Sequence, residues 1–231
     1  MDSKITFTLH ADGKSTEKTI VYNQLLAIGY AGRNIAKTME HIKELEEQLG
    51  VPAPKKIPTI FECSNLLLTQ EEDLQFVGNR TCGEVEYIIL VCGDKIYIGV
   101  GSDHTDRELE GQNVLKAKQI CPKPIGMDVW DYDDLKAHWD SIRVRSFQTV
   151  DGAEIPYQDG TLADILPPEK ILSELRERVG DIGNSVIFSG TVPALAGFKF
   201  GTTFRCELVD DTLSRSIACF YRATAITEEE R

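Results

Sequence analysis

Two glutamates, Glu84 and Glu86, open an apolar stretch that reads EVEYIILV from Glu84 to Val91. Side chains alternate along a β-strand, so both carboxylates would lie on the same face as Ile88 and Leu90. Two like charges side by side are costly unless a proton or a metal ion neutralises them. The stretch therefore indicates either two exposed acids at the rim of a sheet or a site for a hard cation.

A third carboxylate, Asp103, is predicted to reach the same place. The segment EVEYIILVCGDKIYIGVG is typical of a hairpin that turns at Gly93-Asp94. With that turn, paired residues have numbers that sum to about 187, so Asp103 falls at the same end of the hairpin as Glu84 and Glu86. Three carboxylates favour Mg²⁺ or Mn²⁺, and zinc is less expected because no Cys or His cluster accompanies them. Alternatively, Asp103 is the N-cap of a helix over TDRELEG.

Five short motifs in a fixed order resemble the fumarylacetoacetate hydrolase family. GYAGRN is similar to that family's glycine-arginine-asparagine segment before its lid, and EVEYIIL to its metal-binding Glu-x-Glu strand. SDHTDRELE is similar to its Asp-x-(Ser/Thr)-x-Arg-(Asp/Glu)-Leu segment. VDGAEIPYQDGT and FSGTVPALAG resemble its Asn-Gly-Glu…Gln-Asp-Gly stretch and its Thr-Gly-Thr-Pro loop. The matches extend over most of the chain.

The resemblance implies a role for several residues. Glu84, Glu86 and Asp103 would hold the divalent metal, Mg²⁺ or Mn²⁺. Lys118, in LKAKQICP, would be the active-site lysine, with Lys116 as its rival. The substrate-binding residues would be Arg33, Arg107, Gln158, Gly190 and Thr191.

The catalytic base departs from the family pattern. Active members of the family carry a His-Glu pair on the lid helix, and the corresponding positions here hold Thr38 and His41. His41 and Glu44 are three residues apart on the same predicted helix, a spacing that lets a carboxylate orient an imidazole. We expect these two residues to act as the base and its partner, the alternative being a solvent-exposed histidine without a role.

The resemblance also implies a reaction. We expect a divalent-metal-dependent hydrolase that cleaves a C–C bond of an α-keto or β-diketo acid, such as an acylpyruvate, through a metal-bound enolate. Decarboxylation or keto–enol isomerisation on the same metal site is the first alternative, because these reactions need no base-activated water. The second alternative is a non-catalytic scaffold that binds a small acid or a metal, and the missing His-Glu pair favours it.

The elements that must position these residues are mostly strands. Residues 1–25 are predicted to form an N-terminal β-hairpin extension turning at Asp12-Gly13, and residues 26–231 the catalytic domain. Helices are predicted after GYAGRN, over DYDDLKAHWDSI and over PPEKILSELRERVG, with strands between and after them. This pattern indicates the α+β class, and the resemblance implies a mixed β-sheet roll or barrel with a few inserted helices, assembled as a homodimer.

Composition and charge narrow the classes of partner. The 231 residues carry a formal net charge of −12, which argues against nucleic-acid and anionic-membrane binding. The family resemblance implies a small-molecule keto acid as the partner. The longest apolar run, YIILVC, is far shorter than a membrane helix requires. The six cysteines form no Cys-x-x-Cys pair, and we expect a cytoplasmic protein with reduced thiols.

Overall fold

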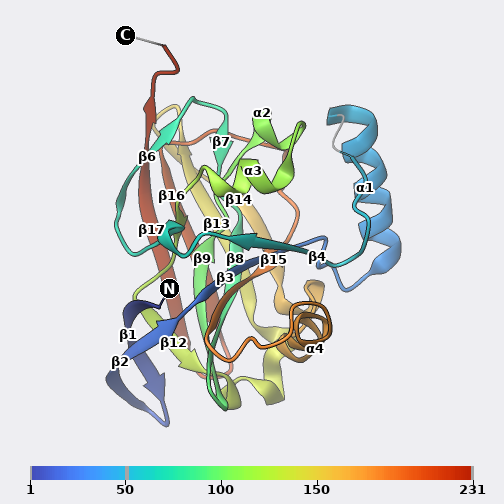
Figure 1. Ribbon diagram of the computed structural model, residues 1–231. Helices are drawn as coiled ribbons and strands as arrows, with labels where there is room; N and C mark the ends of the chain where they lie inside the picture. Colours follow the sequence, from blue (N-terminus) through green and yellow to red (C-terminus); the bar gives the residue numbers. More distant parts are fainter. Residues whose placement is uncertain (1, 50–51, 230–231) are drawn as a thin grey trace.

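Two β-sheets dominate the computed structural model, which describes residues 2–49 and 52–229 (Figure 1). The eight-stranded sheet has the order β2 (Lys14–Tyr22), β1 (Ser3–Ala11), β12 (Asp128–Asp131), β9 (Lys95–Ser102), β8 (Val85–Cys92), β15 (Ser185–Thr191), β3 (Gln24–Gly29) and β4 (Thr59–Cys63). The five-stranded sheet has the order β14 (Ala153–Thr161), β13 (Arg143–Val150), β16 (Thr203–Asp210), β17 (Arg215–Ile226) and β6 (Asp73–Val77). Short strands pair separately: β10 (Thr105–Asp106) with β7 (Thr81–Cys82), and β11 (Lys123–Pro124) with β5 (Leu68–Thr69).

Both sheets are mixed, as the sequence predicts. In the large sheet β1 pairs with β12, and β15 with β3, in parallel, whereas its other neighbours are antiparallel. In the small sheet β17 and β6 are parallel and the remaining pairs antiparallel. These parallel pairs place strands that are far apart in the sequence side by side in one sheet.

The alternation of side chains along β8 divides the apolar core in two. Tyr87, Ile89 and Val91 pack toward the five-stranded sheet, in the larger cluster. Ile88 and Leu90 point the other way, into a second cluster to which strands from β2 at one edge to β4 at the other contribute. Residues from both edges can share one cluster only if the large sheet curls around it. The fold is thus a β-roll whose interior is lined by one face of β8.

The β8–β9 hairpin has the predicted register. Val85 pairs with Ser102 and Glu86 with Gly101, and the backbone N–H of Asp103 donates to the carbonyl of Glu84 at 3.0 Å. The hairpin therefore brings the three carboxyl-bearing positions to its open end, opposite the turn at Gly93-Asp94. In Figure 1 this end lies near α2 (Arg107–Glu110) and α3 (Val114–Gln119).

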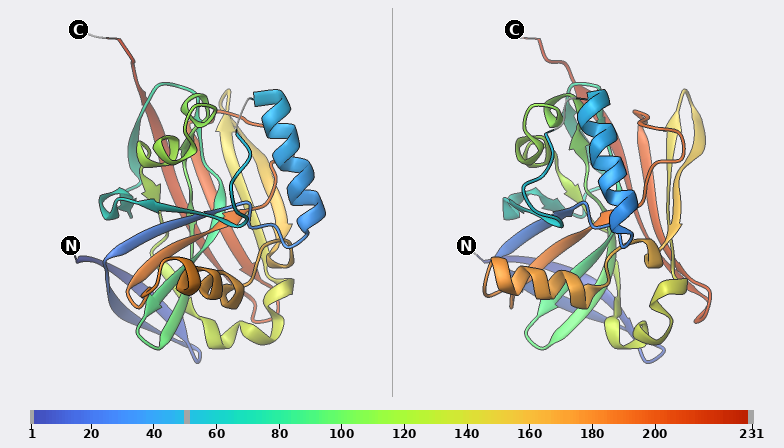
Figure 2. Two further views of the ribbon diagram at one scale, coloured as in Figure 1. Left: turned by 45° about the vertical axis from the view of Figure 1, so that its right-hand side comes forward. Right: turned by 90° about the vertical axis from the view of Figure 1, so that its right-hand side faces the viewer.

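The two long helices lie outside the sheets. α4 (Pro168–Arg178) begins at a proline, as predicted, and buries Ile171, Leu172 and Leu175, whereas Val179, which was expected to face inward with them, is exposed. α1 (Ile35–Leu49) stands at one side of the molecule (Figure 2), with Ile42 buried but Ile35 and Met39 exposed. Of the large apolar side chains described on this helix, these two are therefore left uncovered. The side chains at positions 41, 44, 45, 48 and 49 lie outside the described part of the structure.

The segment DYDDLKAHWDSI differs from the predicted single helix. It forms two 3₁₀ helices, η2 (Tyr132–Asp134) and η3 (Lys136–Ser141), with a non-helical conformation at His138. Asp131 caps the start of the first by accepting a hydrogen bond from the N–H of Asp133. Two further 3₁₀ turns are η1 (Asn65–Leu67) and η4 (Leu162–Asp164).

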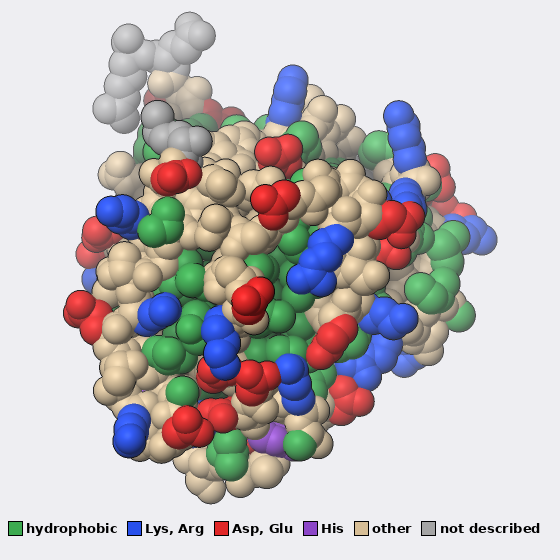
Figure 3. All heavy atoms as spheres, turned by 60° about the horizontal axis from the view of Figure 1, so that its bottom comes forward, with side chains coloured by type: hydrophobic (Ala, Val, Ile, Leu, Met, Phe, Trp, Pro, Cys, Tyr) green, Lys and Arg blue, Asp and Glu red, His purple; other side chains and the backbone are tan. Residues whose placement is uncertain are grey.

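The N-terminal hairpin is part of the large sheet. β1 and β2 turn at Asp12-Gly13, and β1 continues the sheet through its parallel pairing with β12. The boundary at residue 25 between an extension and a catalytic domain stays a prediction. Among the described residues, no helix combines the length and apolarity required to cross a bilayer. Figure 3 shows acidic and basic side chains interspersed on the face at the bottom of Figure 1.

Candidate metal centre

The carboxylates of Glu84, Glu86 and Asp103 converge at the open end of the β8–β9 hairpin. Each offers one oxygen, and these three oxygens all lie within 4.8 Å of one another. Glu86 and Asp103 are buried, with 2% and 1% of their surface exposed, whereas the Glu84 side chain is 20% exposed. The cluster is therefore closed on the side of the sheet and open on the side of Glu84.

Glu86 is held by a β-bulge in the neighbouring strand. The pairing of β15 with β8 shifts between Phe188 and Thr191, so one extra residue is accommodated there. The bulge turns the backbone N–H of Gly190 toward Glu86, and it donates to Oε2 at 2.9 Å. Gly190 has φ +89°, and a Cβ there would lie 2.8 Å from the Cβ of Ala31 and from the carbonyl oxygen of Ile28. Only glycine fits this position.

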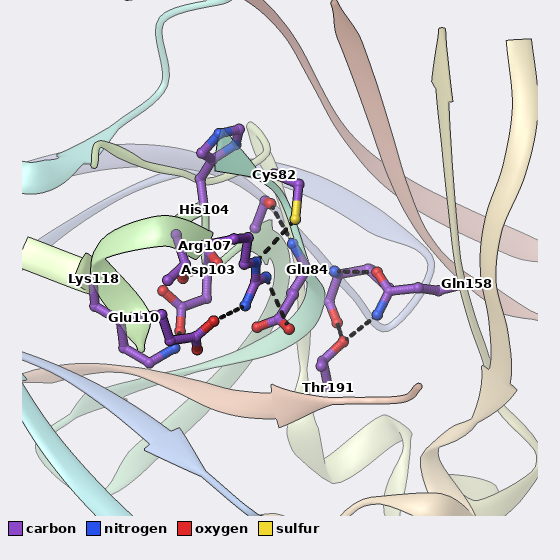
Figure 4. Close-up of polar contacts among 12 residues, drawn as sticks. Cys82, Glu84, Asp103, His104, Arg107, Glu110, Lys118, Gln158 and Thr191 are labelled. Carbon is purple, nitrogen blue, oxygen red and sulfur yellow. Dashed lines mark hydrogen bonds and ion pairs between the residues drawn. The ribbon is translucent and has the colours of Figure 1, made fainter. Parts of the chain in front are cut away.

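Arg107 holds Glu84 from the other side (Figure 4). Its guanidinium forms ion pairs with Glu84 Oε1 at 3.0 Å and with Glu110 Oε2 at 2.9 Å, and its Nε donates to Cys82 Sγ at 3.0 Å. The Arg107 side chain is only 4% exposed, and its guanidinium lies 4.5 Å from the ring centroid of Phe198. Arg107, a predicted substrate-binding residue, is thus buried beside Glu84. Each of its three guanidinium nitrogens contacts another side chain of the protein.

Two lysines contact Asp103. Lys118, on α3, donates to Oδ2, and Lys123, on β11, lies 3.1 Å from Oδ1. Burial alone would raise the pKa of Asp103, but the two ammonium groups outweigh it and the pKa is lowered. Lys116 is exposed, so Lys118 is the lysine that the structure brings to the cluster. The helix cap at this segment is Asp106, which accepts from the N–H groups of Glu108 and Leu109; the alternative role for Asp103 is therefore wrong.

The electrostatics of the cluster fit a divalent cation. Burial, and then the charge of Asp103, raise the pKa of Glu86 well above its usual range, with Lys118 acting in the opposite direction. Two carboxylates buried side by side are stabilised by a positive charge that lies between their oxygens. The donor set contains oxygen alone, which suits Mg²⁺ or Mn²⁺ better than zinc. Glu84, Glu86 and Asp103 are thus the residues that would hold the ion.

Thr191 and Gln158 form a support beneath the same strand. Thr191 Oγ1 donates to the carbonyl of Val85 at 2.6 Å and accepts from Gln158 Nε2 at 2.7 Å. Gln158 is buried; its Nε2 also donates to the carbonyl of Val192, and its Oε1 accepts from the N–H of Val85 and from Ser146. Gln158 has no hydrogen-bonding capacity left for a ligand, whereas Thr191 is partly exposed. Their assignment to substrate binding stays a prediction.

The remaining predicted residues lie around α1. Arg33 forms a two-point ion pair with Asp140 at 2.8 and 2.9 Å and donates to the carbonyls of Leu162 and Ile165, so its guanidinium is engaged. Thr38 donates to the carbonyl of Asn34 at 3.1 Å. His41 and Glu44 belong to α1, but their side chains lie outside the described part of the structure.

Sequence reasoning missed two charged residues of this site. Lys123 lies in a two-residue strand whose motif, KP, carries no signal of its own. Glu110 follows Arg107 by three residues on α2, and that spacing would have predicted their ion pair. With Lys118 and Arg107 these residues complete a cluster of alternating charges around the three carboxylates.

A protein-family model matches most of the chain and shows the family to which it belongs. The model of the family described as "Protein of unknown function (DUF2848)" matches residues 28–221. The chain belongs to the DUF2848 family. Comparison of this DUF2848 protein with curated proteins finds no match.

Solved structures resemble the DUF2848 chain in fold. The "Crystal structures of Cg1458" match with a TM-score of 0.62 at 15% identity, over 93% of this chain and 83% of that one. A 2-keto-3-deoxy-D-arabinonate dehydratase complexed with magnesium and 2,5-dioxopentanoate matches with a TM-score of 0.60 at 13% identity, over 94% and 86% of the chains. A 5-carboxymethyl-2-hydroxymuconate delta-isomerase from Mycobacterium smegmatis matches with a TM-score of 0.57 at 16% identity, over 94% and 88%. The predicted fold, a mixed β-roll of the fumarylacetoacetate hydrolase type, is confirmed.

Proposed function

We propose that this DUF2848 protein is a divalent-metal-dependent enzyme of the fumarylacetoacetate hydrolase superfamily that acts on a small α-keto or β-diketo acid. The observation that carries the proposal is the convergence of Glu84, Glu86 and Asp103, with Lys118 beside them. Two structural neighbours, a keto-acid dehydratase with bound magnesium and a hydroxymuconate isomerase, support it.

The three carboxylates would supply an open-sided site for Mg²⁺ or Mn²⁺. A divalent cation held there would polarise the keto oxygen of a bound acid and stabilise negative charge that develops on it. Glu86 and Asp103 are fixed by Gly190, Lys118 and Lys123, so the ligand oxygens need little rearrangement when the cation binds. Glu84, the most exposed of the three, borders the side from which a substrate would enter.

Lys118 would contribute a second positive charge at the same place. Burial would lower its pKa, but Asp103 and the neighbouring glutamates outweigh burial and raise it, so the ammonium stays charged at neutral pH. A fixed ammonium beside the cation site would hold the carboxylate or the second carbonyl of a keto acid in place. Thr191, which is partly exposed at the end of β15, would lie beside the same site.

Keto–enol isomerisation or decarboxylation is the reaction that the described residues support best. Both need a group that stabilises an enolate, and neither needs a water molecule activated by a base. Thr38 occupies the position of the family's lid histidine, and its hydroxyl is bonded to the backbone of its own helix. Hydrolysis of a C–C bond is the second candidate, favoured by the His41–Glu44 spacing on α1.

Thermal melting with and without Mn²⁺ tests the metal site. A cation at 100 times its dissociation constant stabilises the folded protein by about 2.7 kcal/mol, and Glu86→Gln should abolish this increase. Glu62→Gln, the same change at an exposed position of β4, is the matched control and should retain the full increase. A parent protein that shows no response to Mn²⁺ or Mg²⁺ would refute the proposal.

A substrate panel then separates enzyme from scaffold. Oxaloacetate, acylpyruvates and cyclic diketones are followed by loss of enol absorbance, and turnover that depends on added metal is expected for at least one. If metal binds and no member of the panel is turned over, the non-catalytic scaffold is favoured. For a substrate that is hydrolysed, full activity of His41→Ala would exclude His41 as the base.

A further inference from the structure

Tyr30 has a backbone conformation that tyrosine rarely adopts. Its φ is +55°, in the left-handed region that favours glycine and asparagine. The residue lies between the end of β3 and the start of α1 (Figure 1). A bulky residue keeps such a conformation only where its surroundings over-determine it, and positions of this kind cluster at functional sites.

The segment around Tyr30 packs against β15, the strand whose Gly190 donates a hydrogen bond to Glu86. A Cβ on Gly190 would lie 2.8 Å from both the Cβ of Ala31 and the carbonyl oxygen of Ile28, so the chain on both sides of Tyr30 packs on the bulge of β15. The N–H of Gly190 is the group that binds Glu86. Tyr30 is thus anchored beside the carboxylate cluster.

The hydroxyl of Tyr30 has no hydrogen-bond partner among the described residues, although the side chain is half-buried. The charged groups that act on it are Glu110, Lys118 and Glu84, all members of the cluster around the candidate metal centre. The other polar side chains of the segment are engaged elsewhere. Arg33 binds Asp140, the Asn34 side chain accepts from a backbone N–H of α1, and Thr38 donates to the backbone.

The phenol is kept in its protonated form. Burial raises the pKa of Tyr30 most and Glu110 adds to it, whereas Lys118 acts in the opposite direction and Glu84 has the smallest effect, which also raises the pKa. The phenol therefore has a proton to donate and no hydrogen-bond acceptor among the described residues. A neutral donor placed near a developing negative charge stabilises that charge without first giving up a bond within the protein.

We propose that Tyr30 is a further catalytic residue, whose hydroxyl donates a hydrogen bond to an oxygen of the keto acid bound at Glu84, Glu86 and Asp103. This inference rests on the proposed function and deepens it. The ligand it specifies is a planar α-oxo carboxylate, whose adjacent oxygens reach both the cation and a donor. Tyr30 would give the substrate a polar partner from the segment that precedes α1.

Oxalate, a planar dianion that resembles the enolate of an α-keto acid, is the probe. Mn²⁺ affinity is measured by the electron paramagnetic resonance of the free ion, and oxalate affinity of the Mn²⁺-loaded protein by calorimetry. Tyr30→Phe keeps the ring and should leave the dissociation constant for Mn²⁺ unchanged within twofold. It should weaken oxalate binding at least tenfold. Tyr97→Phe, at a buried tyrosine of β9 with no described hydrogen bond, is the control and should alter neither constant.

Tyr30→Asn separates a catalytic role from a structural one. Asparagine tolerates the left-handed conformation, so this variant should melt at the same temperature as the parent or higher while it loses oxalate binding. A residue retained only for packing would behave in the opposite way: a lower melting temperature with unchanged oxalate affinity of the folded protein.

The outcomes distinguish this inference from the proposed function. If the parent binds Mn²⁺ and oxalate and Tyr30→Phe binds both equally well, Tyr30 is not a substrate ligand, and the metal site stands. If the parent binds no Mn²⁺, the proposed function fails and this inference fails with it. Selective loss of oxalate binding in both Tyr30 variants supports it.

Discussion

The backbone N–H of Gly190 donates a hydrogen bond to Glu86 Oε2 at 2.9 Å, across a bulge between β15 and β8. This contact joins the strand that carries the predicted metal ligands to the loop that was predicted to bind substrate. It supplies a hydrogen bond to one oxygen of a buried carboxylate in the cluster. The position of Glu86 therefore depends on a conformation that only glycine accommodates.

Gly190→Ala should destabilise the protein by about 3 kcal/mol, because a left-handed φ and a backbone clash act together. The added Cβ would lie 2.8 Å from the Cβ of Ala31 and from the carbonyl oxygen of Ile28, so neither neighbour can move without shifting the backbone between β3 and α1. Gly152→Ala is the control: its φ is +79°, but open space surrounds it, and the expected loss is about 1 kcal/mol. Urea denaturation of both variants provides the comparison, and equal losses would contradict the packing argument.

Glu86→Gln should stabilise the protein at pH 8 when measured in EDTA, by roughly 1–3 kcal/mol. The pKa of Glu86 is raised in the folded state by burial and by Asp103. The stabilisation from protonated Glu86 is therefore complete below the unfolded pKa of about 4.3, and it is lost as pH rises through the pKa of Glu86 in the folded protein. Gln keeps the acceptor for Gly190 without that loss. Unfolding free energies at pH 4.5, 6 and 8 should diverge with rising pH; a variant less stable than the parent at pH 8 would refute the argument.

Local sequence patterns were sufficient to predict the hairpins and the convergence of the three carboxylates. The turn at Gly93-Asp94 determines which residues pair, and pairing alone brings Asp103 to Glu84 and Glu86. The last helix, α4, was equally predictable, because the proline at its start and the spacing of its apolar residues both indicate a helix.

The supporting contacts could not be predicted, because they join segments far apart in the sequence. Lys123 reaches Asp103 only because β11 pairs with β5, a contact between two-residue strands with no periodicity. Gly190 reaches Glu86 only because of a one-residue register shift, which no local pattern marks. Arg107 was expected to face a ligand, and its actual orientation follows from the positions of Cys82 and Glu84 on neighbouring strands.

Asp103→Asn should destabilise the protein by about 3–5 kcal/mol at neutral pH, because it removes the carboxylate that both buried lysines, Lys118 and Lys123, contact. The pKa of Asp103 is lowered in the folded state, so its contribution is present above the unfolded pKa of about 3.9 and is lost as pH falls through the folded value. The trend is opposite to that of Glu86. Asp106→Asn, the same change at a helix N-cap where asparagine also serves, is the control and should cost under about 0.5 kcal/mol. Comparable losses in urea melts would show that the two lysines do not depend on Asp103.

Arg107→Lys should weaken Mn²⁺ binding by about tenfold, although none of the three predicted ligands is itself replaced. A guanidinium contacts Glu84, Glu110 and Cys82 at once, at 3.0, 2.9 and 3.0 Å, and a single ammonium cannot reproduce that geometry. Glu84 is the most exposed of the three carboxylates, so it has the most freedom to turn away when Arg107 is lost. Arg80→Lys is the matched control, since Arg80 is exposed and contacts the ring of Phe200 alone among the aromatic side chains described. Competition of each variant with a fluorescent chelator measures the affinity. Unchanged Mn²⁺ affinity in Arg107→Lys would mean that Glu84 is oriented without Arg107, and the predicted role of Arg107 in substrate binding would then be the one to test.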